Sequence, residues 1–161
     1  MNLIYIGKLV NTHGLKGEVK LISDFKYKTD VFKKNNNIYI NDIKYTINSY
    51  RKHKIFDMLT LESIDSIEKA DELKGLSVYI NKDEYKFSGY LDEDLINLDV
   101  YDNETYKGKV VDIYKTDTND LLVIEGNKRH MVPYNDSFIK EVDLKNNKIY
   151  INYIKGLDNE D

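Results

Sequence analysis

Short apolar-rich segments, separated by turn residues, run through almost the whole chain and constrain its fold more than any other feature. Glu18–Ile22 alternates polar and apolar side chains, as a half-buried strand does. In the first half we expect strands at Leu3–Val10, Glu18–Ile22, Asn37–Ile40, Ile43–Tyr50, Ile55–Leu61 and Ser77–Ile80. In the second half we expect strands at Leu95–Tyr101, Gly108–Lys115, Leu121–Glu125, Lys128–Val132 and Lys148–Tyr153. The pairs Asn41-Asp42, Gly126-Asn127 and Asn146-Asn147 predict hairpin turns between them.

One helix is expected near the end of the first half. Asp65 is suited to be its N-cap, with Glu68 three residues later completing a capping box. A narrow apolar stripe at spacing three consists of Ile67, Ala70 and Leu73. Gly75 then stands where a left-handed C-terminal cap belongs.

The strand pattern breaks once, in the polar and aromatic stretch after residue 82. A chain of 161 residues is long enough for two small domains. We therefore expect a mainly β protein with a first domain at residues 1–82, a linker at 83–91 and a second domain at 92–161 with a short acidic, frayed tail. The strand spacing of the second domain is typical of a small barrel or sandwich, and the single helix closes the first domain.

Composition excludes several classes of function. The chain has no cysteine, so disulfides, thiol nucleophiles and thiolate metal sites are ruled out. No apolar run approaches the roughly 18 residues of a membrane span, and the first residues do not resemble a signal peptide. We expect a cytoplasmic protein without a membrane association.

Charge divides the chain into two unlike halves. Residues 1–82 hold 14 Lys and Arg against 10 Asp and Glu, a net of +4, whereas residues 83–161 hold 10 against 18, a net of −8. A basic half favours contact with a phosphate backbone, and an acidic half favours a basic protein partner. Ordinary solvated faces are an equally good reading of charge alone.

Residues 11–18 form the most unusual segment. Gly14 and Gly17 bracket Leu15 and Lys16 between two expected strands. Glycines permit positive φ and close backbone approach, so Thr12, His13, Gly14, Lys16 and Gly17 are candidates for contact with phosphate groups. The alternative, favoured by shape alone, is a long hairpin loop that needs two glycines to turn.

The same region is rich in cations and aromatic rings. Residues 8–54 hold 11 Lys and Arg against 4 Asp and Glu, a net of +7. The interleaved aromatic residues are Phe25, Tyr27, Phe32, Tyr39, Tyr45 and Tyr50. Such a surface suits RNA, through ion pairing and base stacking. Most tyrosines in a sheet are packing partners, however, so we expect only one or two to be free for stacking.

No pattern of residues supports an enzyme. The histidines His13, His53 and His130 lack metal-ligand spacing, and we interpret each as a surface or packing residue. There is no phosphate-binding loop of the strand–glycine–lysine type and no nucleophile elbow. We expect no catalytic residues, no metal and no cofactor.

The order of several segments resembles the RimM family of ribosome maturation factors across about residues 4–157. Its N-terminal signature resembles the stretch from Ile6 to Lys20, and the end of its first domain resembles Ala70–Ile80. Its PRC-barrel domain resembles, in order, the stretches Asp94–Val100, Lys107–Tyr114, Asp120–Ile124, Met131–Tyr134, Phe138–Asp143 and Lys155–Leu157.

This resemblance implies a fold and a role. The fold is a six-stranded N-terminal barrel of translation-factor type followed by a C-terminal PRC barrel. The role is assembly of the small-subunit head and rRNA maturation, through binding of a small-subunit head ribosomal protein, chiefly by the C-terminal half. Partners would be that protein and the assembling small subunit with its rRNA, bound by a monomer. We place the protein contact at Tyr90, Leu91 and Leu95, although Leu95 fits the core of a strand equally well.

The chain departs from the family pattern at three positions. Leu91 replaces the second of two tyrosines, which puts in doubt any role for a second phenol. Asn97 replaces a glycine and can still adopt a left-handed turn. Lys155 replaces a proline.

Two other functions remain open. The first is a general RNA-binding module that acts through the basic N-terminal barrel alone. The second is an rRNA-processing enzyme, which would require catalytic residues that no pattern in the sequence indicates.

Overall fold

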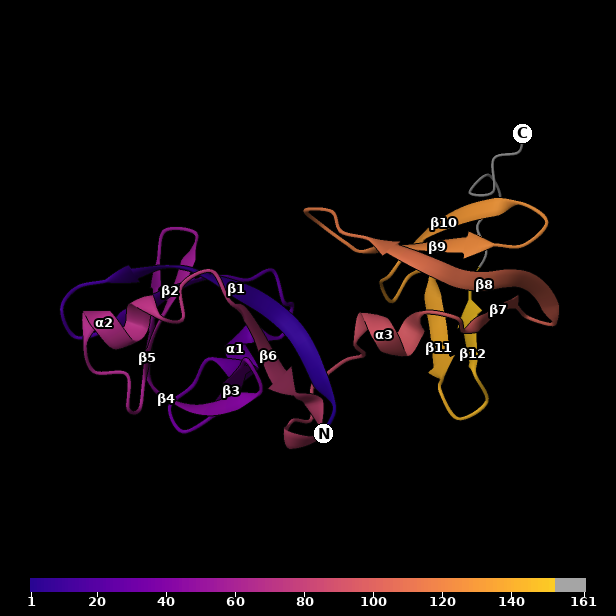
Figure 1. The fold of residues 1–161 in the computed structure, drawn as a ribbon. Helices are drawn as coiled ribbons and strands as arrows, with labels where there is room; N and C mark the ends of the chain where they lie inside the picture. Colours follow the sequence, from indigo (N-terminus) through magenta and orange to yellow (C-terminus); the bar gives the residue numbers. More distant parts are fainter. Residues whose placement is uncertain (153–161) are drawn as a thin grey trace. The chain divides into compact units, whose positions relative to one another are not determined.

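The chain folds into two units, Met1–Ser88 and Gly89–Asp161, each with its own strands (Figure 1). This computed structural model describes residues 1–152. Each unit has a separate hydrophobic core. The expected mainly β class is confirmed.

The first unit is a closed six-stranded barrel with the order β1-β2-β5-β4-β3-β6. Its strands are β1 (Leu3–His13), β2 (Glu18–Ile22), β3 (Asn37–Ile40), β4 (Ile43–His53), β5 (Phe56–Leu61) and β6 (Ser77–Asn81). Alternate residues of each strand face opposite sides. Val19 and Leu21 of β2 therefore lie in the barrel core, whereas Glu18 and Lys20 face outward.

The hairpin turn between β3 and β4 is confirmed. Asn41 and Asp42 have φ values of 52° and 64°, and Ile40 pairs directly with Ile43. Two successive positive φ values are those of a type I′ turn, whose twist matches the flanking strands.

The expected helix is α2 (Ile67–Asp71), but the predicted N-cap was wrong by one residue. Ser66 is the cap, and its hydroxyl accepts a hydrogen bond from the Lys69 amide. The Asp65 carboxylate instead forms an ion pair with the Lys69 ammonium at 3.0 Å. Gly75 has the expected left-handed φ of 83°, but it is not the cap of α2, whose C-cap is Glu72.

The prediction of a single helix was wrong. The first unit also contains α1 (Lys28–Val31) and the 3-10 turn η1 (Lys82–Glu84), and the second begins with α3 (Asp92–Leu95). Each has only three or four residues, too few to repeat an apolar spacing that sequence could reveal.

The second unit is a six-stranded sheet with the order β10-β9-β8-β7-β12-β11, in which β7 and β12 are parallel. Its strands are β7 (Asp99–Asp102), β8 (Thr105–Tyr114), β9 (Leu121–Glu125), β10 (Arg129–Pro133), β11 (Ile139–Asp143) and β12 (Lys148–Ile151). The turns at Gly126-Asn127 and Asn146-Asn147 are confirmed, and Asn97 has the expected left-handed φ, 72°.

Two strand predictions in this unit were wrong. The strand expected from Leu95 starts at Asp99, because Leu95 ends α3. The strand β11 was missed. The predicted end of the last strand at Tyr153, the resemblance at Lys155 and the predicted acidic tail fall outside the described residues.

Candidate functional site

The unusual loop is the tip of the β1–β2 hairpin, and its two glycines serve different needs. Gly14 and Gly17 both have positive φ, 78° and 86°. A side-chain carbon at Gly14 would meet nothing within 4 Å, but one at Gly17 would lie 2.8 Å from the Ser66 carbonyl oxygen and 2.9 Å from that of Ile64. At Gly17, glycine is needed because the backbone before α2 approaches closely. At Gly14, glycine is favoured only because the backbone has a positive φ.

The rest of this tip is anchored on one side and exposed on the other. The Thr12 hydroxyl donates a hydrogen bond to the Asp71 carboxylate of α2 at 3.0 Å. His13 and Lys16 are exposed, and Leu15 is 82% exposed. An apolar side chain held in water beside a cation at a rigid turn is suited to contact with a partner.

His13 lies beside His53, a neighbour that no pattern in the sequence predicts. The rings of His13 and His53 are 6.3 Å apart, although forty positions separate them. Near both rings, Arg51 donates two hydrogen bonds of 2.8 Å to the Glu18 carboxylate. On the outer face of the barrel, Met58 pairs in register with Lys20 on one side and with Arg51 on the other, yet it is fully buried. The long side chains of Lys20 and Arg51 therefore cover it.

The electrostatic environment favours the ionised forms of Glu18 and Arg51. The hydrogen bond from Arg51 lowers the pKa of the Glu18 carboxyl, and the nearby charges of Arg51, His13 and His53 act in the same direction. The same contact raises the pKa of Arg51. Glu18 thus stays ionised and holds Arg51 in place.

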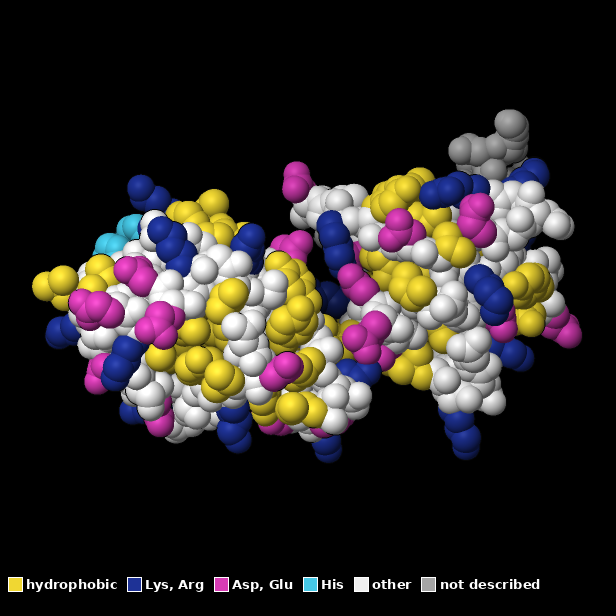
Figure 2. Space-filling model, viewed as in Figure 1, with side chains coloured by type: hydrophobic (Ala, Val, Ile, Leu, Met, Phe, Trp, Pro, Cys, Tyr) yellow, Lys and Arg dark blue, Asp and Glu magenta, His cyan; other side chains and the backbone are white. Residues whose placement is uncertain are grey.

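The contact between the two histidines brings a second hairpin tip beside the first. His53 ends β4, and the turn that follows contains Lys54, with φ 57°, and Ile55, which is 70% exposed. We name the combined surface the two-hairpin surface and define it as His13, Leu15, Lys16, Arg51, His53, Lys54 and Ile55. Figure 2 shows histidine side chains on the first unit next to cationic and hydrophobic ones.

Most of the interleaved aromatic rings are packing residues, as the alternative reading stated. Phe32 and Tyr39 are 3% and 6% exposed. Phe25 packs against the core and contacts Tyr27 and Phe87 edge-on. Tyr50 retains 39% exposure, but its hydroxyl donates to Asp57. Base stacking by this set is therefore restricted, and the exposed groups of the two-hairpin surface are mainly cationic and aliphatic.

The three residues proposed for protein contact differ in accessibility. Leu95 is 1% exposed and lies in the core of the second unit, so its side chain is not open to a partner in this fold. Leu91 is 8% exposed, and its amide donates to the Asp94 carboxylate. Tyr90 packs against the core but is only partly buried. A role in contact stays a prediction, and Tyr90 is its best-placed member.

Sequence reasoning missed Arg51, His53, Lys54 and Ile55 as members of the site. The only signal was a basic run before the β5 strand. Among residues 1–152, no group of side chains is arranged to hold a metal ion. Within the same range, no helix is long and apolar enough to cross a membrane.

Family models match both units of the chain. The RimM N-terminal domain matches residues 4–85, and the RimM PRC barrel domain matches residues 92–157. Curated relatives include the ribosome maturation factor RimM of two Staphylococcus aureus strains, bovine RF122 / ET3-1 and JH9. Each is 37% identical over 163 residues, covering 96% of this chain and 98% of the relative.

Solved structures with detectable similarity carry related names. One is a putative 16S ribosomal RNA processing protein RimM from Pseudomonas aeruginosa, 21% identical, with a TM-score of 0.47 over 95% of this chain and 98% of that one. Another is the N-terminal domain of RimM from Thermus thermophilus, 18% identical, with a TM-score of 0.47 over 55% of this chain and all of that one.

Proposed function

The chain belongs to the RimM family, and we propose that it is a ribosome maturation factor that binds a small-subunit head ribosomal protein and assists head assembly and rRNA processing. It acts in the cytoplasm as a monomer, by binding and without catalysing a reaction. The observation that carries the proposal is the family match across both units.

The two-hairpin surface supports a contact of the first unit with rRNA in the assembling particle. Lys16 belongs to the β1–β2 turn and Lys54 to the β4–β5 turn, and the rings of His13 and His53, which end β1 and β4, lie 6.3 Å apart. Cations on short, anchored turns can follow a phosphate backbone without a large loss of conformational freedom on binding. Leu15 and Ile55 add exposed apolar area that suits a packed contact with the particle.

The acidic second half supports a contact with a basic protein. Its net charge of −8 accelerates the encounter with a cationic partner. Tyr90 supplies a partly exposed aromatic group that can serve as an anchor within a charged rim.

This assignment is tested with the full chain and the isolated head ribosomal protein, by surface plasmon resonance over a range of salt concentrations. We expect binding, with salt slowing association more than it speeds dissociation, because screening acts first on steering. Tyr90→Ala is expected to speed dissociation, whereas Tyr114→Ala, on another exposed tyrosine of this unit, is not. Equal effects of the two substitutions, or no binding of the protein, would contradict the assignment.

The second candidate is a general RNA-binding module acting through the basic N-terminal barrel, favoured by the net +7 of residues 8–54. It predicts that the full chain binds naked rRNA more tightly than the head protein. It also predicts that any exposed lysine of the first unit contributes about equally, because diffuse charge has no preferred position.

A further inference from the structure

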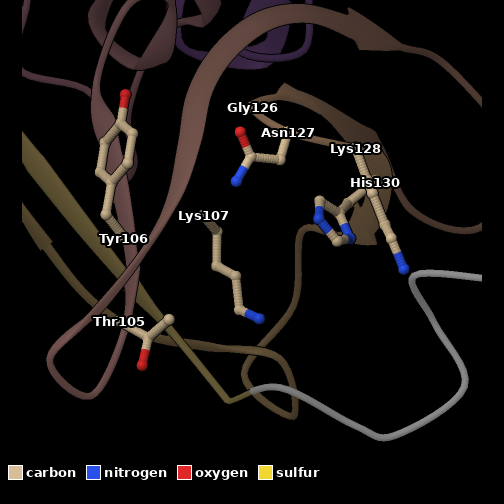
Figure 3. A pocket seen from close by; sticks show the side chains of 7 residues that line it. All are labelled: Thr105, Tyr106, Lys107, Gly126, Asn127, Lys128 and His130. Carbon is tan, nitrogen blue, oxygen red and sulfur yellow. The ribbon is translucent and has the colours of Figure 1, made fainter.

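We propose that the second unit carries a phosphate-binding site in a hollow between the start of β8 and the β9–β10 turn, and that its ligand is a phosphate group of an RNA backbone. The hollow has a volume of about 340 Å³. Figure 3 shows the Lys107 amine, the His130 ring and the Asn127 amide around one space, whereas the Lys128 amine lies beyond the His130 ring and the Tyr106 ring points away.

The groups that line the hollow are suited to an oxyanion. Two ammonium groups, an imidazole, an amide and the Thr105 hydroxyl can all donate hydrogen bonds to phosphate oxygens. None of the described residues that line it carries a carboxylate. His130 is 8% exposed, so a donor here is partly shielded from water, which strengthens its interaction with an anion.

Basic side chains line this hollow although the surrounding unit is acidic overall. Residues 83–161 have a net charge of −8, yet Lys107, Lys128 and His130 all line this one hollow. The nearest carboxylate along β9, that of Glu125, pairs with Arg129 at 3.6 Å. Glu125 and Arg129 face the side of the hairpin opposite to His130, because successive residues of a strand alternate. Their charges therefore lie away from the hollow and balance each other.

The floor of the hollow is rigid. Gly108 has φ 131°, and a side-chain carbon there would overlap the Glu125 carbonyl. A side-chain carbon at Gly126 would overlap the Lys107 carbonyl in the same way. The backbones of β8 and the β9–β10 turn are thus packed as closely as glycine allows. This packing fixes the spacing of Lys107 and Lys128 before any ligand binds, which reduces the cost of ordering them.

The site consists of other residues than the surfaces that the proposed function uses. The two-hairpin surface lies in the first unit, and Tyr90 precedes α3. Failure of the phosphate site would therefore leave the ribosome-maturation proposal intact. Confirmation of the phosphate site would add an RNA contact to the second unit, whose net negative charge otherwise repels RNA.

The test is a titration of the full ¹⁵N-labelled chain followed by NMR at constant ionic strength. The probes are inorganic phosphate, a short single-stranded RNA and an acidic peptide of equal charge. We expect saturable shifts of the Gly126, Asn127 and Lys128 amides with phosphate, and the same shifts at lower concentration with RNA. Shifts with the acidic peptide but not with RNA, or no saturable shift with phosphate, would overturn the proposal.

Substitutions locate the site. Lys107→Gln and Lys128→Gln should each weaken phosphate binding by about tenfold, the loss of one charge-assisted hydrogen bond. Each should also lower the slope of log affinity against log salt for RNA by about 0.7. Lys140→Gln removes the same charge from an exposed position on β11 and should change neither quantity. Equal effects of all three substitutions would show diffuse attraction and overturn the site, provided that the melting temperatures stay unchanged.

Discussion

The carboxylate of Asp57 is fully buried in the first unit, and its Oδ2 atom lies 2.9 Å from the Lys28 ammonium. Lys28 belongs to α1 and Asp57 to β5, so the pair joins a short helix to the barrel wall. Tyr50 donates a hydrogen bond of 2.7 Å to the other oxygen, and Lys52 lies 3.6 Å from it.

Removing Lys28 should destabilise the protein far more than removing Lys52. Lys28→Met leaves a buried carboxylate without its closest cation, at a cost of about 3 kcal/mol in the free energy of unfolding. Lys52 is 48% exposed and more distant, so Lys52→Met should cost less than about 1 kcal/mol. Urea denaturation of both variants measures the difference, and equal losses would show that Asp57 does not depend on Lys28.

Alanine substitutions at the two glycines of the β1–β2 tip should have unequal effects. Gly14→Ala places a side chain in open space, so it should cost only the left-handed strain of about 1–2 kcal/mol. Gly17→Ala adds a clash with the backbone before α2 and should cost at least about 2 kcal/mol more. Thermal melts followed by circular dichroism compare them. A Gly17→Ala variant as stable as Gly14→Ala would refute the close packing at this position.

Limited proteolysis should cut first between residues 82 and 92, where we propose that the domains are joined. Phe87 stacks on Tyr27 and Tyr85, which ties the chain to the first unit up to that point. Ser88 and Gly89 are exposed and lie at the division between the units, so a protease of broad specificity should cleave there. Mass spectrometry of the first fragments gives the position. Initial cleavage inside β7–β12 would contradict this boundary.

Local features of the fold could be predicted from the sequence because they depend on neighbouring residues. The Asn41-Asp42 turn needs two residues that tolerate positive φ between alternating segments, and both conditions are visible in the chain. The N-cap of α2 was misplaced because Asp65 and Ser66 are both good caps. The ion pair of Asp65 with Lys69 leaves the capping to Ser66.

The candidate site could be predicted only in part, because it depends on barrel closure. The pair of glycines around Lys16 allowed the loop to be recognised in the sequence. Nothing in the sequence indicated that His53 lies beside this loop. Closure with the order β1-β2-β5-β4-β3-β6 brings His13 and His53 together across two intervening strands. A pattern along one chain does not encode that pairing. The burial of Leu95 was one of the two readings offered, but its cause was not predicted: Leu95 ends the short helix α3 instead of belonging to a strand.

The central claim, that the two-hairpin surface binds the assembling small subunit, is tested most directly by co-sedimentation of charge-reversed full chains with immature small subunits. Lys16→Glu/Lys54→Glu reverses one exposed cation on each tip, and Lys33→Glu/Lys34→Glu reverses two exposed lysines just after α1. Both variants change the net charge equally and should keep the melting temperature of the unmodified chain. We predict that the first variant binds at least about tenfold more weakly, a loss of about 1.4 kcal/mol, and that the second binds almost as well as the unmodified chain. Equal weakening by the two variants, or full binding by the first, would contradict the claim.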